Sequence, residues 1–177
     1  MKNRVVDGKE IIKKFRFYDQ KINKLWAKKQ KIEALLYMSL LVEFFVKDLI
    51  ITFEKIVEGA AFSCGVGFNP RNLYSRDNIE DQPLGYLIKI LNTYTKDKSL
   101  IKDLKYFSNI RNKCVHKLFE HKISKVNQEL KRFNIFYYKL IIKLVSLSVA
   151  QSKLLKKSFK HICDDCFKKA LPKVIKL

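Results

Sequence analysis

Glycine and proline are scarce in this chain, and their scarcity limits the folds that it can adopt. The 177 residues contain five glycines and three prolines. All-β architectures and the glycine-rich loops that bind nucleotide phosphates need more turn-forming residues than this. Apolar residues make up 47% of the chain, enough to form one sizeable core. The composition therefore predicts a single, mostly helical domain, at most with a short extension.

Apolar residues recur at helical spacing along most of the chain, and no segment favours a strand. We expect helices over residues 9–28, 30–58, 84–94, 100–120 and 123–156. Gly59 should end the second of these helices, and Ser99 should cap the fourth. The sequence thus predicts an all-α, up-and-down bundle of five to six helices over residues 1–156. Residues 157–177 should form a basic, helical C-terminal extension.

One irregular region interrupts the helical pattern between residues 59 and 82. It is rich in glycine, asparagine and aspartate, and loops of this length are often functional or mobile. Arg71 and Arg76 lie in it. Its position before the later helices makes it a candidate gate or ligand contact.

The chain is strongly basic. It has 37 Lys and Arg residues against 17 Asp and Glu, a formal net charge of +20. A charge of this size on a folded domain indicates a polyanionic partner, such as nucleic acid, an anionic membrane or an acidic protein. Lysine runs are often solvated faces, but solubility alone accounts poorly for +20. Phosphate contacts along an RNA backbone explain the charge better, and they would make affinity depend strongly on salt.

Neither the start of the chain nor its apolar stretches favour a membrane-spanning protein. Residues 1–14 carry charges throughout and lack the apolar core of a signal peptide. The two long apolar stretches, residues 34–53 and 135–150, are each interrupted by charged residues. A spanning helix needs about 20 mostly apolar residues. We therefore expect both stretches to be core helices of a cytoplasmic protein that does not bind membranes.

The stretch from Tyr106 to Phe119 carries the residues best suited to chemistry. It contains Arg111 and Asn112, followed after three residues by His116. Each helical residue advances by about 100°, so Asn109, Asn112 and His116 form one polar stripe. Arg111 and His116 differ in direction by about 140°. A site that uses both is more natural where two copies of the helix face each other across a dimer.

These residue types suit the cleavage of RNA without a metal ion. Arginine offers a planar, permanently charged group for phosphate oxygens, and histidine exchanges protons near neutral pH. RNA supplies its own nucleophile, the 2′-OH, so the protein needs to provide a base, an acid and stabilisation of the phosphorane. The sequence offers no convincing acidic cluster for a two-metal nuclease. We therefore expect neither a metal nor a cofactor.

Residues 110–119 resemble the signature of the HEPN superfamily. That signature is an Arg, usually a polar residue next, and a His after four to six intervening residues, on a helix of a small all-α bundle. The order of helices is also similar over roughly residues 10–155. The resemblance implies a homodimer with a composite site and a metal-independent endoribonuclease that leaves 2′,3′-cyclic phosphate ends. Members often act as toxins, phage-defence effectors or RNA-processing domains, which implies a possible antitoxin or regulatory partner protein.

Arg111, Asn112 and His116 match the signature position by position. On this resemblance His116 is the general acid or base, Arg111 stabilises charge in the transition state, and Asn112 orients the imidazole or the scissile phosphate. Weaker candidates for contact with RNA are Lys113, Lys117, Asn109, Arg71 and Arg76.

Three other interpretations stay open from the sequence. Some HEPN-like domains are inactive, so the chain can be a non-catalytic module that binds RNA or protein. The basic C-terminal segment also fits a helical interaction protein or a membrane-surface protein. In the simplest structural interpretation, Arg111 is a surface cation paired with a nearby acid and His116 is partly buried.

Four cysteines are expected to be reduced and unbridged, at positions 64, 114, 163 and 166. Cys163 and Cys166, with His161 nearby, resemble half of a zinc site. A structural zinc needs four ligands and the second pair is missing, so we do not expect a metal there.

Overall fold

The computed structural model of this chain is all-α, as the sequence predicts. The structure describes residues 8–63, 79, 81–120, 123–130 and 133–160. Within these residues it contains six helices and no strand: α1 (Gly8–Ala27), α2 (Lys31–Ser63), α3 (Leu84–Tyr94), α4 (Lys98–Phe119), α5 (Ile123–Glu129) and α6 (Phe133–Lys160).

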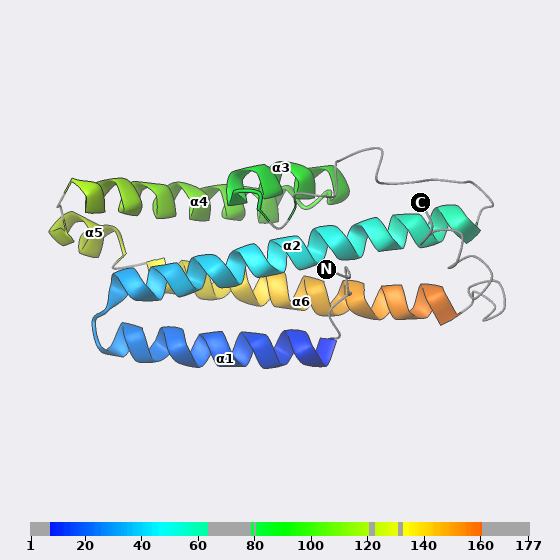
Figure 1. Cartoon of the computed structure of the whole chain (residues 1–177), viewed down its shortest axis with the longest axis horizontal. Helices are drawn as coiled ribbons and strands as arrows, with labels where there is room; N and C mark the ends of the chain where they lie inside the picture. The colour runs from blue at the N-terminus through cyan, green and yellow to red at the C-terminus, as the bar shows by residue number, and fades with distance from the viewer. Residues whose placement is uncertain (1–7, 64–78, 80, 121–122, 131–132, 161–177) are drawn as a thin grey trace.

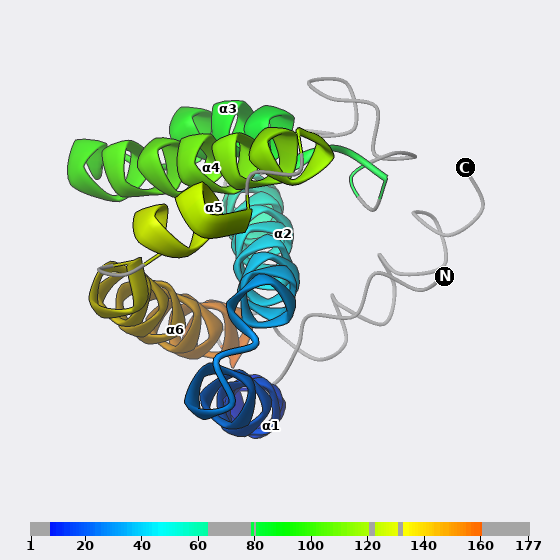
Figure 2. The same cartoon turned by 90° about the vertical axis from the view of Figure 1, so that its left-hand side faces the viewer.

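The helices form three layers (Figures 1 and 2). The long helices α2 and α6 lie side by side in the middle layer and make the most extensive contact of any pair. On one side of this layer lie α3 and α4, with the short α5 beside α4, and on the other side lies α1. The motif helix α4 and the first helix α1 are therefore separated by the α2–α6 layer.

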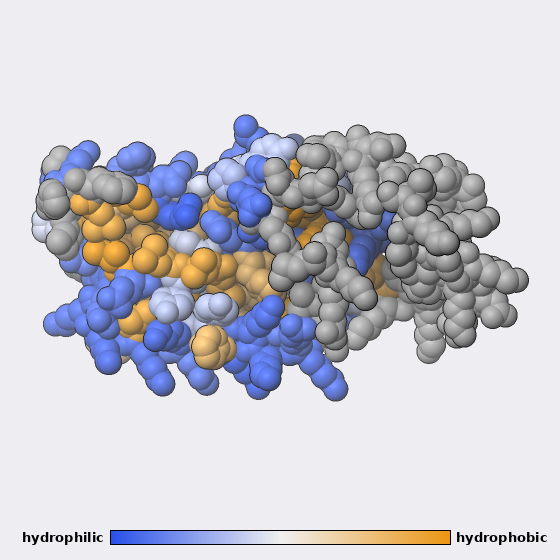
Figure 3. All heavy atoms as spheres, in the orientation of Figure 1, coloured by the Kyte–Doolittle hydropathy of each residue, from blue (hydrophilic) through white to orange (hydrophobic). Residues whose placement is uncertain are grey.

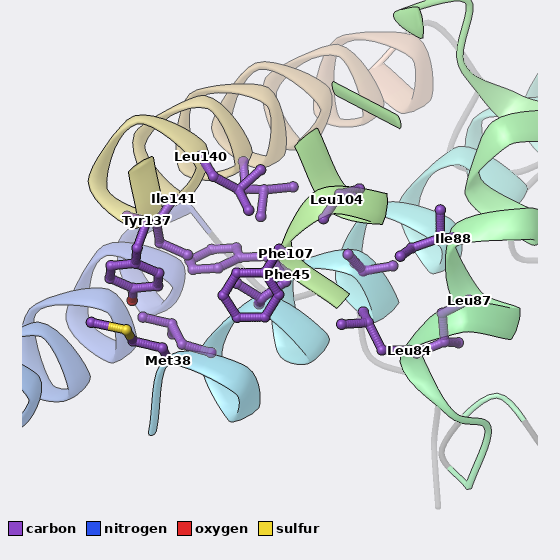
Figure 4. Packing of buried hydrophobic residues seen from close by; sticks show 14 of the residues in the cluster. Met38, Phe45, Leu84, Leu87, Ile88, Leu104, Phe107, Tyr137, Leu140 and Ile141 are labelled. Carbon is purple, nitrogen blue, oxygen red and sulfur yellow. The ribbon is translucent and has the colours of Figure 1, made fainter. Parts of the chain in front are cut away.

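The core lies where α2, α3, α4 and α6 meet (Figure 4). Phe107 of α4 is fully buried, and its ring centroid lies 5.4 Å from that of Phe133 and 6.5 Å from that of Tyr137. Phe45 of α2 is also fully buried in this cluster. Leu87 of α3 lies at the end of the cluster away from Tyr137. These large side chains fix the rotation of α4 about its own axis, because its aromatic face must point into the bundle.

The ends of two helices differ from those that we expected. The expected cap of α4, Ser99, lies inside the helix, and the N-cap is Asp97, whose carboxylate accepts a hydrogen bond from Leu100 N at 2.9 Å. Asp97 is the better cap because its charged oxygen also interacts favourably with the helix dipole. Gly59 does not end α2, because the helix continues to Ser63. The glycine is buried, and the two alanines that follow it are strong helix formers.

The long helix expected over residues 123–156 is in fact two helices, α5 and α6. The break follows Leu130, whose carbonyl accepts a turn hydrogen bond from Phe133 N at 3.2 Å. Val126, Leu130 and Phe133 are all buried, so the break lets α5 pack on α4 while α6 packs on α2. The predicted boundary between residues 156 and 157 falls inside α6, and residues 161–177 lie outside the described part of the chain.

One described helix is long and apolar enough to cross a membrane by length and composition. This segment, Phe133–Leu155, has a mean hydropathy of 1.4 over its most apolar window. Core helices of soluble bundles meet the same criterion, and the face of α6 that carries Tyr137, Ile141 and Leu144 is fully buried in this bundle. The segment is therefore weak evidence for a membrane location.

A charged residue lies in the contact between α2 and α6. Asp48 is only 6% exposed, and its Oδ2 has no hydrogen-bond partner within the described residues. Burial raises the pKa of the Asp48 carboxyl from 3.8 to about 6, although nearby Ser148 and Lys14 act in the opposite direction. Loss of hydration disfavours the carboxylate more than these neighbours stabilise it.

Candidate functional site

The helix α4 has one buried face and one solvent face, and the motif spans both. The buried face carries the residues that hold α4 in the bundle: Leu104, Phe107, Ile110 and Cys114. Asn109, Asn112 and His116 are all exposed, and their spacing places them on one stripe opposite the core. The structure therefore brings three of the predicted polar residues to one surface.

Arg111 lies on the flank of α4 that faces α2. Its Nη2 is 3.6 Å from Oε1 of Glu43, and the two side chains are 33% and 21% exposed. At this distance the pair is an electrostatic contact rather than a hydrogen bond. The guanidinium is thus directed away from His116 but stays partly open to solvent. The Arg111–Glu43 pair is what the simplest structural interpretation predicted, a surface cation paired with a nearby acid. The pairing also restricts the position of the arginine side chain.

Asn112 and His116 have no side-chain hydrogen bond to any residue that the structure describes. Asn112 therefore does not orient the imidazole within the single chain, and both side chains are free to meet a ligand. His116 is exposed rather than partly buried. A solvent-facing imidazole on a rigid helix can accept or donate a proton from a bound substrate.

The weaker candidates fall in different places. Lys113 is exposed at the motif, whereas Lys117 donates a 2.7 Å hydrogen bond to Oε1 of Glu129 on α5. This hydrogen bond and the lysine charge lower the pKa of the Glu129 carboxyl. Lys117 therefore points toward α5, away from the flank that carries Arg111. Arg71 and Arg76 lie outside the described residues.

The possible metal ligands of the C-terminal segment, His161, Cys163 and Cys166, also lie outside the described residues. Among the residues that are described, no group of three or more His, Cys, Asp or Glu could hold a metal ion. Cys114 is a buried free cysteine, and burial raises the pKa of its thiol. It is part of the core rather than of a reactive site.

Glu43 is a functional candidate that the sequence alone did not single out. It interrupts the apolar stretch of α2, and a charged residue within such a stretch is a signal for a specific partner. The sequence alone could not supply that partner, because Arg111 lies on a helix distant in the chain. Only the packing of α4 beside α2 brings the two charges together.

An apolar surface adjoins this ion pair. Leu36 and Leu40 are each 54% exposed, and they lie on the same face of α2 as Glu43 because the three are spaced at helical intervals. Figure 3 shows hydrophobic side chains along this face, between the edge formed by α4 and the edge formed by α1. Exposed leucines clustered in this way are typical of a surface that another molecule covers.

No protein-family model, curated protein or solved structure matches this chain. The resemblance to the HEPN signature therefore rests on residues 110–119 and on the order of the helices.

Proposed function

We propose that this chain is an endoribonuclease that cleaves RNA without a metal ion, at a site shared by two copies of the chain. The observation that carries the proposal is the motif helix. One rigid helix presents His116 and Asn112 to solvent and Arg111 at its flank, within a chain of net charge +20. The basic surface attracts the RNA, and the motif supplies the reacting groups.

The chemistry follows from these three side chains. A neutral His116 takes the proton from the 2′-OH, whose oxygen then attacks the adjacent phosphorus. Arg111 stabilises the negative charge of the phosphorane, and Asn112 donates a hydrogen bond to a phosphate oxygen. Protonation of the departing 5′ oxygen by an imidazolium completes the step. The products are a 2′,3′-cyclic phosphate and a 5′-OH.

A second copy of the chain supplies what one copy lacks. Within one copy Arg111 is directed toward Glu43 of α2, while His116 points outward from α4. The exposed leucines at positions 36 and 40 provide an apolar surface beside the arginine. If a symmetric dimer buries that surface, Arg111 of one copy approaches His116 of the partner subunit, and each site combines residues of both.

Cleavage in excess EDTA tests the reaction. Purified wild type should cleave total and transfer RNA and leave cyclic phosphate ends, and His116→Ala should not. The matched control is His161→Ala, another of the three histidines in the chain. Equal cleavage by wild type and His116→Ala would refute the proposal. Absence of cleavage by wild type, with RNA binding retained, would identify a non-catalytic binding module instead.

Mixing two inactive variants tests the shared site. Arg111→Ala and His116→Ala, unfolded and refolded together, form mixed dimers in which one of the two sites keeps both wild-type residues. Since half of the dimers are mixed, activity should return to about a quarter of the wild-type level. If the mixed dimers form and remain inactive, Arg111 and His116 do not act across the interface in this way.

A nuclease of the toxin or phage-defence type should also be harmful when it is expressed. Induced wild type should arrest growth, whereas His116→Ala at equal protein level should not. Growth arrest by both proteins would trace the toxicity to the basic surface and not to cleavage.

A further inference from the structure

The outer face of α1 is basic and has an exposed aromatic ring at its centre. One side of α1 is buried through Ile11, Ile22 and Leu25. The exposed part of the helix surface beside this buried side carries Phe17, which is 66% accessible to solvent. Around it are three exposed lysines of the helix, Lys13, Lys21 and Lys24, and Lys28 follows directly after the helix ends. By helical geometry the three lysines of α1 lie within about 40° of Phe17 around the helix axis.

The phenylalanine is held in place although it is exposed. Its ring centroid lies 5.4 Å from that of Tyr18, and the two planes are 85° apart, in an edge-to-face contact. Tyr18 is itself part of the bundle, because its ring lies 6.2 Å from that of Tyr37 on α2. One face of the Phe17 ring is therefore available at a fixed position on the surface.

Within the described residues, the acidic side chains of α1 do not compensate the positive charge on this face. Of the two acidic residues of α1, Glu10 pairs with Lys14 at 3.7 Å, and Asp19 accepts a hydrogen bond from Asn23 at 3.2 Å. Neither Lys13 nor Lys24 has an ion pair with any residue that the structure describes. In Figure 3 hydrophilic side chains line the lower edge of the molecule, where α1 lies.

We propose that this face of α1 binds single-stranded nucleic acid, with a base stacked on Phe17 and backbone phosphates on the lysines around it. The stripe from Lys13 to Lys24 extends over about 16 Å, long enough to follow a few nucleotides. Every base has an aromatic face, so this contact selects unpaired strands and not a particular sequence. A duplex would keep its bases away from the ring.

A membrane surface fits this face less well. A helix that inserts into the interface presents a broad apolar side to the lipid. Here the broad apolar side of α1 is buried in the bundle, and the exposed ring is surrounded by charged groups. An array of cations about a single ring matches alternating phosphates and bases better than it matches hydrocarbon.

This surface is separate from the motif, because α1 and α4 lie on opposite sides of the α2–α6 layer (Figure 2). The inference rests on the proposed function, because both take RNA as the partner of the chain. The α1 surface adds a second contact, which holds the RNA strand while another part of the strand reaches α4. The contact therefore contributes to affinity and not to the chemical step.

Binding of a fluorescent 2′-O-methyl oligonucleotide tests the inference without interference from cleavage, since the capped 2′ oxygen cannot attack. Phe17→Ala should weaken binding by about 5-fold to 140-fold, the range expected for loss of one stacked base. Ile142→Ala is the matched control, because Ile142 is an exposed apolar residue of α6, 57% accessible. It should leave the affinity unchanged.

The salt dependence tests the lysines. The double variant Lys13→Gln/Lys24→Gln should reduce the slope of log affinity against log salt by about 1.4, at about 0.7 per phosphate contact on a single strand. The double variant Lys139→Gln/Lys153→Gln removes the same charge from exposed positions of α6 and should change the slope less. Equal changes would mean that only the total charge matters, and would refute a local site.

Two further results would overturn the inference. One is an unchanged affinity of a folded Phe17→Ala variant for the oligonucleotide. The other is tight binding of wild type to phosphatidylserine vesicles that is lost in Phe17→Ala and that displaces the oligonucleotide, which would identify a membrane contact. The oligonucleotide assay involves no cleavage, so its outcome does not depend on whether His116 is catalytic, and failure of the nuclease proposal and failure of this one are distinguishable.

Discussion

Replacement of the buried Asp48 by asparagine should stabilise the protein at neutral pH. Asp48 is 6% exposed between α2 and α6, and its pKa is raised from 3.8 to about 6. Above pH 7 the folded state therefore holds a carboxylate that is disfavoured by burial. The shift of 6 − 3.8 = 2.2 corresponds to about 3 kcal/mol, at 1.36 kcal/mol for each pKa unit.

The sign of the pH dependence follows from the direction of this shift. Between pH 4 and 6 the folded state binds the Asp48 proton more tightly than the unfolded state does. The free energy of unfolding therefore falls as the pH rises through this range. Asparagine cannot ionise, so the advantage of Asp48→Asn over wild type should grow from pH 4 to pH 7.5 by up to about 3 kcal/mol.

Urea denaturation of both proteins at pH 4 and pH 7.5 measures this change. The control is Asp97→Asn, because a hydrogen bond from Leu100 N lowers the pKa of the Asp97 carboxyl. The Asp97 carboxylate stabilises the folded state above its unfolded pKa, and this stabilisation is lost in acid. The free energy of unfolding of Asp97→Asn should therefore fall relative to that of wild type as the pH rises. An Asp48→Asn advantage that is the same at both pH values would refute the reasoning.

Three other substitutions test the fold and the site. Phe107→Ala removes a fully buried ring and should lower the free energy of unfolding by about 3–5 kcal/mol in urea denaturation. A loss below 1 kcal/mol would mean that α4 does not pack as described. Glu43→Gln removes the acid beside the motif arginine and should tighten RNA binding up to about fivefold, the effect of an ion pair worth up to about 1 kcal/mol. Glu33→Gln, an exposed acid of the same helix, should have a smaller effect, and equal effects would refute a local role. Leu40→Lys places a charge on the apolar surface of α2 and should convert dimers to monomers in light scattering, whereas Ile142→Lys on α6 should not. Persistence of the dimer in Leu40→Lys would place the interface elsewhere.

Local patterns in the sequence were enough to predict most of the helices. The predicted helix over residues 84–94 coincides with α3, because Pro83 marks its start and apolar residues recur through it. The long predicted helix after residue 123 was wrong, because no glycine or proline marks the break between α5 and α6. Leu130 and Phe133 are both buried across that break. The apolar pattern is therefore the same whether the chain turns there or continues.

In the candidate site, too, some features could be predicted from the sequence and others could not. The exposed stripe of Asn109, Asn112 and His116 could be predicted, because it depends only on helical spacing and on which face of α4 is apolar. The contact between Arg111 and Glu43 could not be predicted, since it depends on how α4 lies against α2. Tertiary packing determines such long-range pairs, and the periodicity of one helix carries no information about them.

The buried thiol of Cys114 gives experimental access to the opening of the motif helix. Cys114 lies between Arg111 and His116, fully buried, and the raised pKa of its thiol keeps it protonated and slow to react. An alkylating reagent can reach it only when α4 leaves the core. The modification rate, measured on the peptide that contains residue 114, therefore reports how often the segment with the proposed chemistry detaches. Because Phe107 and Ile110 share its buried face, that detachment breaks the aromatic core as well.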